Sequence, residues 1–209
     1  MPGDVLSGRY PLTNPFAKGT GLQPNATQPN LPVRSNSEAG FVIPNLGAAT
    51  DGGAALVSGN VTLVAVPVEI GDTYSAVDVL VGATAASAPT HQSVGIYNAA
   101  GTLVASSGDG DTSAISAKGL WSIPLEVPYI ANTTDAPNGY VFVGVTVTAT
   151  TVPSLVSGSV IVVAQVPAYE GSPPFYAASG GAAQNGVVPP SVNVADATVQ
   201  TDVPVVFLR

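Results

Sequence analysis

The residues that could act in catalysis or bind a metal are few and lie far apart in this chain. His91 is the only histidine, and there is no cysteine, so disulfides and thiolate metal sites are excluded. A nucleophilic serine needs a base beside it. His91 would have to be that base, but the chain contains no Gly-x-Ser-x-Gly turn. We therefore expect His91 to start a strand and to hydrogen-bond a neighbouring loop or subunit, and we expect the chain not to be an enzyme.

The acidic residues suggest no catalytic pair either, because glycoside hydrolysis needs two carboxyl groups that face each other across a cleft. The four glutamates are scattered, at Glu38, Glu69, Glu126 and Glu170. The stretch 108–113 places Asp109 and Asp111 at alternate positions, as a calcium loop does at its start, but no bidentate glutamate follows at the end. Asp and Gly are also common turn residues. We therefore expect a solvated turn here, with Asp109 and Asp111 as the only metal candidates, and no cofactor.

Four aromatic residues are candidates for stacking on a sugar: Trp121, Tyr129, Phe175 and Tyr176. A tryptophan on an apolar strand face usually belongs to the core, and we expect this of Trp121. Phe175 and Tyr176 fall in a stretch rich in Gly, Pro and Ser, residues 171–191. A loop of this length in a compact domain is usually functional or docked on something. Phe175 and Tyr176 are thus the candidate ligand or partner contacts.

The composition predicts the kind of scaffold that holds these residues. Hydrophobic residues make up 45% of the 209 residues and charged residues only 9%, with 23 Gly and 19 Pro. Glycine and proline interrupt long helices, whereas the abundant Val and Thr favour strands. The chain is therefore expected to be all-β with many short strands.

Alternating patterns place these strands along the chain. They indicate a strand pair or one long bent strand over 55–70, then strands or hairpins over 74–81, 93–106, 119–127, 140–149, 159–166 and 203–208. Pro67 implies a strand end or a sheet edge. About seven strands separated by turns fit an antiparallel β-sandwich, jelly-roll-like, over residues 41–209.

The alternation also assigns faces to the strands. Val77, Val79 and Val81 share one side of their strand, and Trp121, Ile123 and Leu125 share one side of another. In the clearest strand, 140–149, the face with Val at every second position is expected in the core. The Thr end of its other face is expected in solvent.

Residues 1–40 form a separate region in this prediction. Six prolines interrupt it, and isolated apolar residues with a few basic ones recur along it. We interpret it as an extended docking arm that orders on a neighbouring protein. Its candidate anchors are Leu6, Arg9, Tyr10, Leu12, Phe16, Leu22 and Leu31.

Charge and hydropathy exclude some partners. Residues 35–209 carry two basic and twelve acidic residues, while residues 1–34 carry three basic residues and one acidic residue. An acidic body repels phosphate backbones, so we expect no nucleic acid. No run of about 18 residues is uniformly apolar, as a spanning helix requires. The first four residues also lack the basic start of a secretory signal. We expect no membrane partner.

Several stretches resemble virion surface proteins of phages that infect actinobacteria. They are Thr90-His91-Gln92 with the hairpin that follows to Ser107, and residues 61–68, 82–86, 139–145 and 151–155. The resemblance covers roughly residues 56–165. It implies a non-enzymatic structural protein on the virion surface: a capsid decoration, a head fibre or a minor tail protein.

Two functions remain open at this point. In the first, the chain decorates or stabilises the shell, anchored by its arm to major capsid or tail proteins, as a homo-oligomer such as a trimer. In the alternative, it is a minor tail or receptor-binding protein that recognises a host cell-wall glycan through Phe175 and Tyr176.

Overall fold

The structure is a computed structural model, and it describes residues 34–35, 50–159, 177–195, 197–199 and 202–209. The chain divides into two units, residues 1–31 and 32–209, and all described residues belong to the second. The domain boundary expected at residue 40 falls among residues outside the described part. In that part there are strands, turns and one 3₁₀ turn, η3 (Ala114–Ser116), and no helix is long and apolar enough to cross a membrane.

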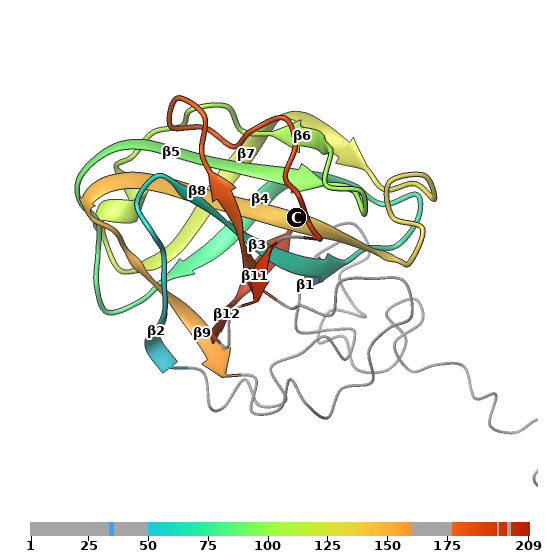
Figure 1. Cartoon of the computed structure of the whole chain (residues 1–209). Coiled ribbons are helices and arrows are strands. Elements are labelled where there is room, and N and C mark those ends of the chain that lie inside the picture. Colours follow the sequence, from blue (N-terminus) through green and yellow to red (C-terminus); the bar gives the residue numbers. More distant parts are fainter. Residues whose placement is uncertain (1–33, 36–49, 160–176, 196, 200–201) are drawn as a thin grey trace, which may run out of the picture. The chain divides into compact units, whose positions relative to one another are not determined.

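One sheet has six antiparallel strands (Figure 1). Their order is β11 (Thr198–Val199), β10 (Ala177–Ala182), β3 (Asn60–Pro67), β8 (Tyr140–Thr151), β5 (Ser87–Tyr97) and β6 (Leu103–Ser106). The hairpin expected over 93–106 is confirmed as β5 and β6. Pro67 lies at the end of β3, where its missing N–H costs no ladder bond in the middle of the strand.

The other sheet has seven strands. It contains β1 (Arg34–Ser35), β13 (Val206–Leu208), β4 (Thr73–Val81), β9 (Ser154–Ser159) and β12 (Asp202–Pro204), with β2 (Thr50–Ala55) paired to β9 and β7 (Gly119–Ile130) paired to β4. The C-terminal strand changes partner within this sheet, since β12 pairs with β9 and β13 pairs with β4.

Most consecutive strands alternate between the two sheets, so the chain crosses the core repeatedly. This arrangement confirms the expected antiparallel β-sandwich. Of the stretch 55–70, expected as a strand pair or one bent strand, residues 60–67 form the single strand β3. The preceding strand β2 ends at Ala55, where the stretch begins, and lies in the other sheet. Gly59 has a φ of +73° in the turn between them. Apart from Ser159, the last residue of β9, the strand expected at 159–166 lies outside the described part.

The main core lies between the sheets and follows the predicted faces. The inward valines of β8, at positions 141, 143, 145 and 147, are fully buried. They pack with the inward valines of β4 and with Trp121, Ile123 and Leu125 of β7. Burial of large aliphatic and aromatic side chains contributes about 1.5–3 kcal/mol each, which stabilises a fold without disulfides.

A second apolar cluster covers the outer face of the six-stranded sheet. It contains Val61, Leu63, Ala65, Tyr97, Tyr140, Phe142, Val188, Val192 and Val194. The last three come from residues 183–195, which we call the cover segment. In Figure 1 this segment follows β10 in orange and red and crosses strands β8 and β5. The expectation that the Thr end of β8 is solvated is therefore wrong at Thr146, which is fully buried.

Two glycines let the cover segment approach the sheet. Gly95 of β5 and Gly144 of β8 are directly opposite each other. A Cβ on Gly144 would lie 2.7 Å from the ring of Tyr97, and a Cβ on Gly95 would lie 2.9 Å from Val188. Side chains therefore fill the space that these two residues leave empty. The long loop expected at 171–191 is corrected accordingly: β10 and much of the cover segment fall within it, packed on the chain's own sheet.

Candidate functional site

The only histidine forms a hydrogen bond with a loop carboxylate. His91 lies within β5 rather than at its start, and its Nδ1 is 2.8 Å from Oδ2 of Asp109. The carboxylate is an acceptor only, so Nδ1 carries the hydrogen of this bond. The backbone N–H of Gln92 donates to the other oxygen of Asp109 at 3.3 Å. The expected hydrogen bond from His91 to a neighbouring loop is thus confirmed, 18 residues along the chain.

This pair is half exposed, with 40% of the His91 side chain and 44% of the Asp109 side chain accessible. An exposed contact of this kind between a ring nitrogen and a carboxylate contributes about 0–1 kcal/mol to stability. A Cβ on Gly186, in the cover segment, would overlap the His91 ring. The imidazole therefore lies against bare backbone, between the cover segment and the Asp109 loop.

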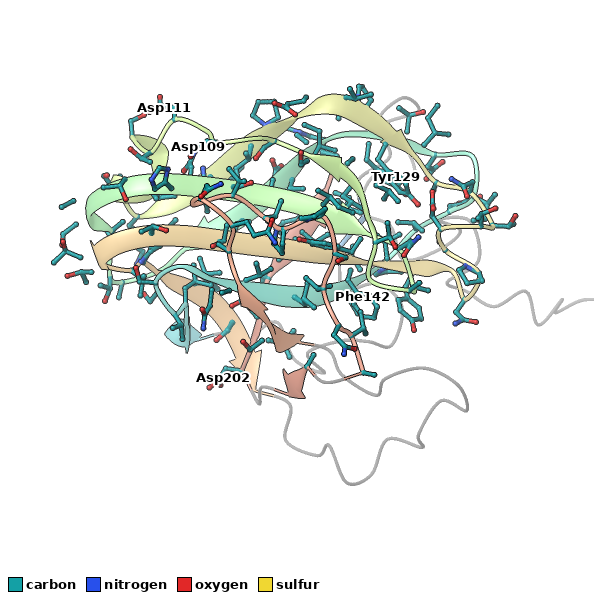
Figure 2. The ribbon with its side chains drawn as sticks, turned by 45° about the horizontal axis from the view of Figure 1, so that its top comes forward. Asp109, Asp111, Tyr129, Phe142 and Asp202 are labelled. Atoms are coloured by element: carbon teal, nitrogen blue, oxygen red, sulfur yellow. The ribbon has the colours of Figure 1, made fainter. Side chains whose placement is uncertain are left out.

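Asp111 stabilises the conformation of its own loop. It accepts bonds from both the backbone N–H and the hydroxyl of Ser113, each at 2.9 Å. The backbone bond from Ser113 is the main cause that lowers the pKa of Asp111. The side-chain amide of Gln92 donates to the Asp111 carbonyl, which ties the loop to β5. Figure 2 shows Asp109 and Asp111 in this loop region, well apart from Tyr129.

The arrangement limits the chemistry that these residues can perform. A His–Asp pair orients an imidazole, but catalysis also needs a nucleophile at the other ring nitrogen. Within the described part of the chain, the hydrogen bond shown for the His91 ring is the one to Asp109. Likewise, no three His, Asp or Glu side chains among the described residues lie close enough together to hold a metal ion.

A different kind of surface appears along β7. Its side chains Leu120, Val127 and Ile130 are 59%, 68% and 59% exposed, and Ile70 in the β3–β4 turn is 46% exposed. Exposed apolar side chains that gather in one place mark interaction sites more often than scattered ones do. Among the described strands, β7 pairs only with β4, so its other side is a free edge.

Pro124 blocks that edge against a further strand. It lies opposite Ala76 of β4, whose N–H and C=O both bond to the backbone of Arg209 on the side of β13. In an antiparallel pair of this kind the partner's polar groups also point away. The ring nitrogen of Pro124 therefore faces the free edge and offers no donor there. A partner at this edge has to be bound through side chains.

The remaining candidate residues lie outside the described part of the chain. This applies to Phe175 and Tyr176 and to the arm residues Leu6, Arg9, Tyr10, Leu12, Phe16, Leu22 and Leu31. At the end of the arm region, Arg34 and Ser35 form β1 and pair with Leu208 and Phe207 of β13. Trp121 is buried in the core, as expected.

Sequence reasoning missed the exposed edge of β7. The sequence signal is weak, since Val127 continues the alternation of Trp121, Ile123 and Leu125, and only Ile130 departs from it. Four residues, 125–128, lie between the two β7 residues that pair with Tyr74 and Ala76. This bulge turns Val127 outward.

No protein-family model matches this chain, and no curated protein matches it in sequence.

Proposed function

We propose that the chain is a structural protein of the surface of a phage particle, a capsid decoration or head fibre that is anchored by its N-terminal arm. It stabilises or decorates the assembled shell next to major capsid proteins, as a homo-oligomer. It performs no catalysis and needs no cofactor.

The observation that carries this proposal is where the phage-like stretches fall in the fold. Residues 61–68 cover most of β3, residues 139–145 begin β8, and residues 90–107 cover most of β5 and all of β6. These are four consecutive strands of the six-stranded sheet, in the order β3-β8-β5-β6.

The two remaining stretches also touch each other. The backbone N–H of Gly82 donates to the Ser154 carbonyl at 2.8 Å, and the N–H of Ser154 donates to the Thr84 carbonyl at 2.9 Å. The stretches are dispersed in sequence but form one neighbourhood in space. A resemblance between folded units requires this proximity, which supports the proposal.

The surface gives independent support. The apolar side chains on the edge strand β7 suit contacts with other proteins, and Pro124 prevents uncontrolled strand addition at the same edge. Both properties fit a protein that is displayed at high local concentration on a particle.

Immunogold electron microscopy of purified infectious particles tests the proposal, with pre-immune antibody as the control. Label distributed over the head supports a decoration or head fibre. Label confined to the tail refutes the head assignment and favours the alternative, a minor tail protein that binds a host glycan. Absence of label from intact particles in which the shell protein is labelled overturns the virion proposal.

A further inference from the structure

We propose that one end of the sandwich, around Ile70, Val127 and Ile130, is the docking seat for the N-terminal arm of a second copy of this chain. We call these three residues the end patch. The inference rests on the proposed function in one respect, that residues 1–40 are a docking arm. It goes further in naming the partner and the surface.

The end patch consists of neighbouring segments. The N–H of Gly71 donates to the Ala131 carbonyl at 2.8 Å, and the N–H of Ala131 donates to the Asp72 carbonyl at 2.9 Å. Ile70 directly precedes Gly71, and Ile130 directly precedes Ala131. These hydrogen bonds therefore hold the β3–β4 turn, which carries Ile70, next to the end of β7, which carries Ile130. Val127 lies three residues before Ile130, in the outward bulge of β7. Three of the five large hydrophobic residues exposed in the described chain are thus in one place.

The base of the patch is well ordered by its contacts. Tyr74 and Tyr129 lie beneath it as a stacked pair, with ring centroids 6.4 Å apart and planes at 19°. The Tyr74 hydroxyl donates to Asp72 at 3.2 Å. A surface that is already fixed loses little side-chain entropy when it binds, which favours association.

The charges around the patch identify its occupant. Glu69 and Asp72 lie in the β3–β4 turn, and Asp135 lies in the loop after β7, where its charge helps to raise the pKa of Tyr129. The patch is therefore apolar with an acidic surround. The fitting partner is an extended segment that carries both apolar and basic side chains.

The chain itself contains such a segment, in residues 1–34. Arg9 and Lys18 lie among the apolar residues Tyr10, Leu12 and Phe16. This part of the chain has three basic residues and one acidic residue, against two basic and twelve acidic residues in 35–209. The N-terminal segment and the body are thus complementary in charge, whereas two bodies repel each other.

The segment is also long enough to reach another copy. Thirty-three residues span at most about 110 Å when fully extended, several times the length of the strands in this sandwich. A contact between the arm of one copy and the end of the next uses two different surfaces. Such a heterologous contact can close as a ring or, between two copies, by reciprocal exchange of arms, and either outcome gives the homo-oligomer proposed above.

The test uses the purified full-length chain and sedimentation velocity over about 1–100 µM. One variant disables the seat, Val127→Asp with Ile130→Asp, and another disables the arm, Arg9→Glu with Lys18→Glu. The matched control is Leu120→Asp, because Leu120 is as exposed as Ile130 and lies at the other end of the same strand. Circular dichroism confirms that each variant is folded.

We expect the wild type and the Leu120→Asp control to associate, and each double variant to associate at least about tenfold more weakly. Mixing the two double variants should restore a heterodimer, because one supplies an intact arm and the other an intact seat. The arm variant leaves the sandwich untouched, so its result stands even if the seat variant unfolds.

Three results would overturn the inference. They are a wild type that stays monomeric throughout the range, a control that dissociates as much as the seat variant, and folded variants that fail to complement each other. None of these affects the immunogold result. A monomer in solution that still labels the particle would mean that the arm binds the shell instead of a second copy.

Discussion

Replacing Tyr97 by phenylalanine removes one hydroxyl from the contact between the six-stranded sheet and the cover segment. The Tyr97 side chain is fully buried, and its hydroxyl donates to the Pro189 carbonyl at 2.8 Å. The ring itself stays in place on Gly144, so packing is retained. What is lost is one buried hydrogen bond, and the Pro189 carbonyl remains buried without its donor.

A buried acceptor that loses its donor costs about 1–3 kcal/mol, and we expect a loss of about 1–2 kcal/mol in the free energy of unfolding. For a body of this size that lowers Tm by roughly 3–6 °C. Urea denaturation measures the global effect. Hydrogen exchange measures the local one, because the amides of Leu103 and Val192 bond to Pro190 and Gly101 where the cover segment meets the sheet. These two amides should exchange faster in Tyr97→Phe.

Ser58→Ala is the matched control. The Ser58 hydroxyl also bonds to a distant residue, since it donates to the Ala149 carbonyl at 3.0 Å and accepts from the Ala149 N–H at 3.1 Å, but it does so in solvent. Its loss should change the free energy by no more than about 0.5 kcal/mol. If Tyr97→Phe is as neutral as Ser58→Ala, and the Leu103 and Val192 amides stay protected, then the hydroxyl does not hold the cover segment.

Other substitutions and conditions give further predictions. Gly186→Ala should lower the Tm in thermal denaturation more than Gly139→Ala does. Both positions have positive φ, but only at position 186 would a Cβ meet the His91 ring. Equal decreases in Tm would contradict that contact. Thr146→Val should raise the free energy of unfolding by up to about 1 kcal/mol, because the buried Thr146 hydroxyl has no described partner; a loss would show that the hydroxyl is satisfied. Burial is the main cause that raises the pKa of Tyr129 to about 12, so the unfolded chain releases this proton first, near pH 10. The stabilisation is complete below pH 10 and is lost as the pH rises toward 12. Urea denaturation from pH 9 to 11.5 should therefore show a shallower decline for Tyr129→Phe, and identical slopes would contradict the assignment.

Strands that pack one face against the opposite sheet could be predicted from sequence. In β4 and β8 the inward positions carry valine at every second residue, and this period follows directly from the geometry of a strand. Trp121 was placed in the core for the same reason. Local patterning is sufficient when a single core decides which side chains are buried.

The second layer could not be predicted in this way. On β8 the outward positions carry Tyr140, Phe142, Gly144 and Thr146, a mixture that fits solvent as well as a buried face. Its burial depends on the cover segment, some forty residues later in the chain, whose Gly and Pro content is typical of a loop. The pairing of His91 with Asp109 was predictable only as a contact with some loop, because the turn that places Asp109 is set by tertiary packing.

The most direct test of the account is to measure this chain in purified particles by quantitative mass spectrometry. Particles should be assembled with the full-length chain or with a chain that lacks residues 1–33. We predict that the full-length chain co-purifies at a fixed ratio to the shell protein and that the shortened chain falls to background. If the full-length chain is absent from infectious particles, the proposed function is wrong, and if the shortened chain is incorporated equally well, the arm is not the anchor.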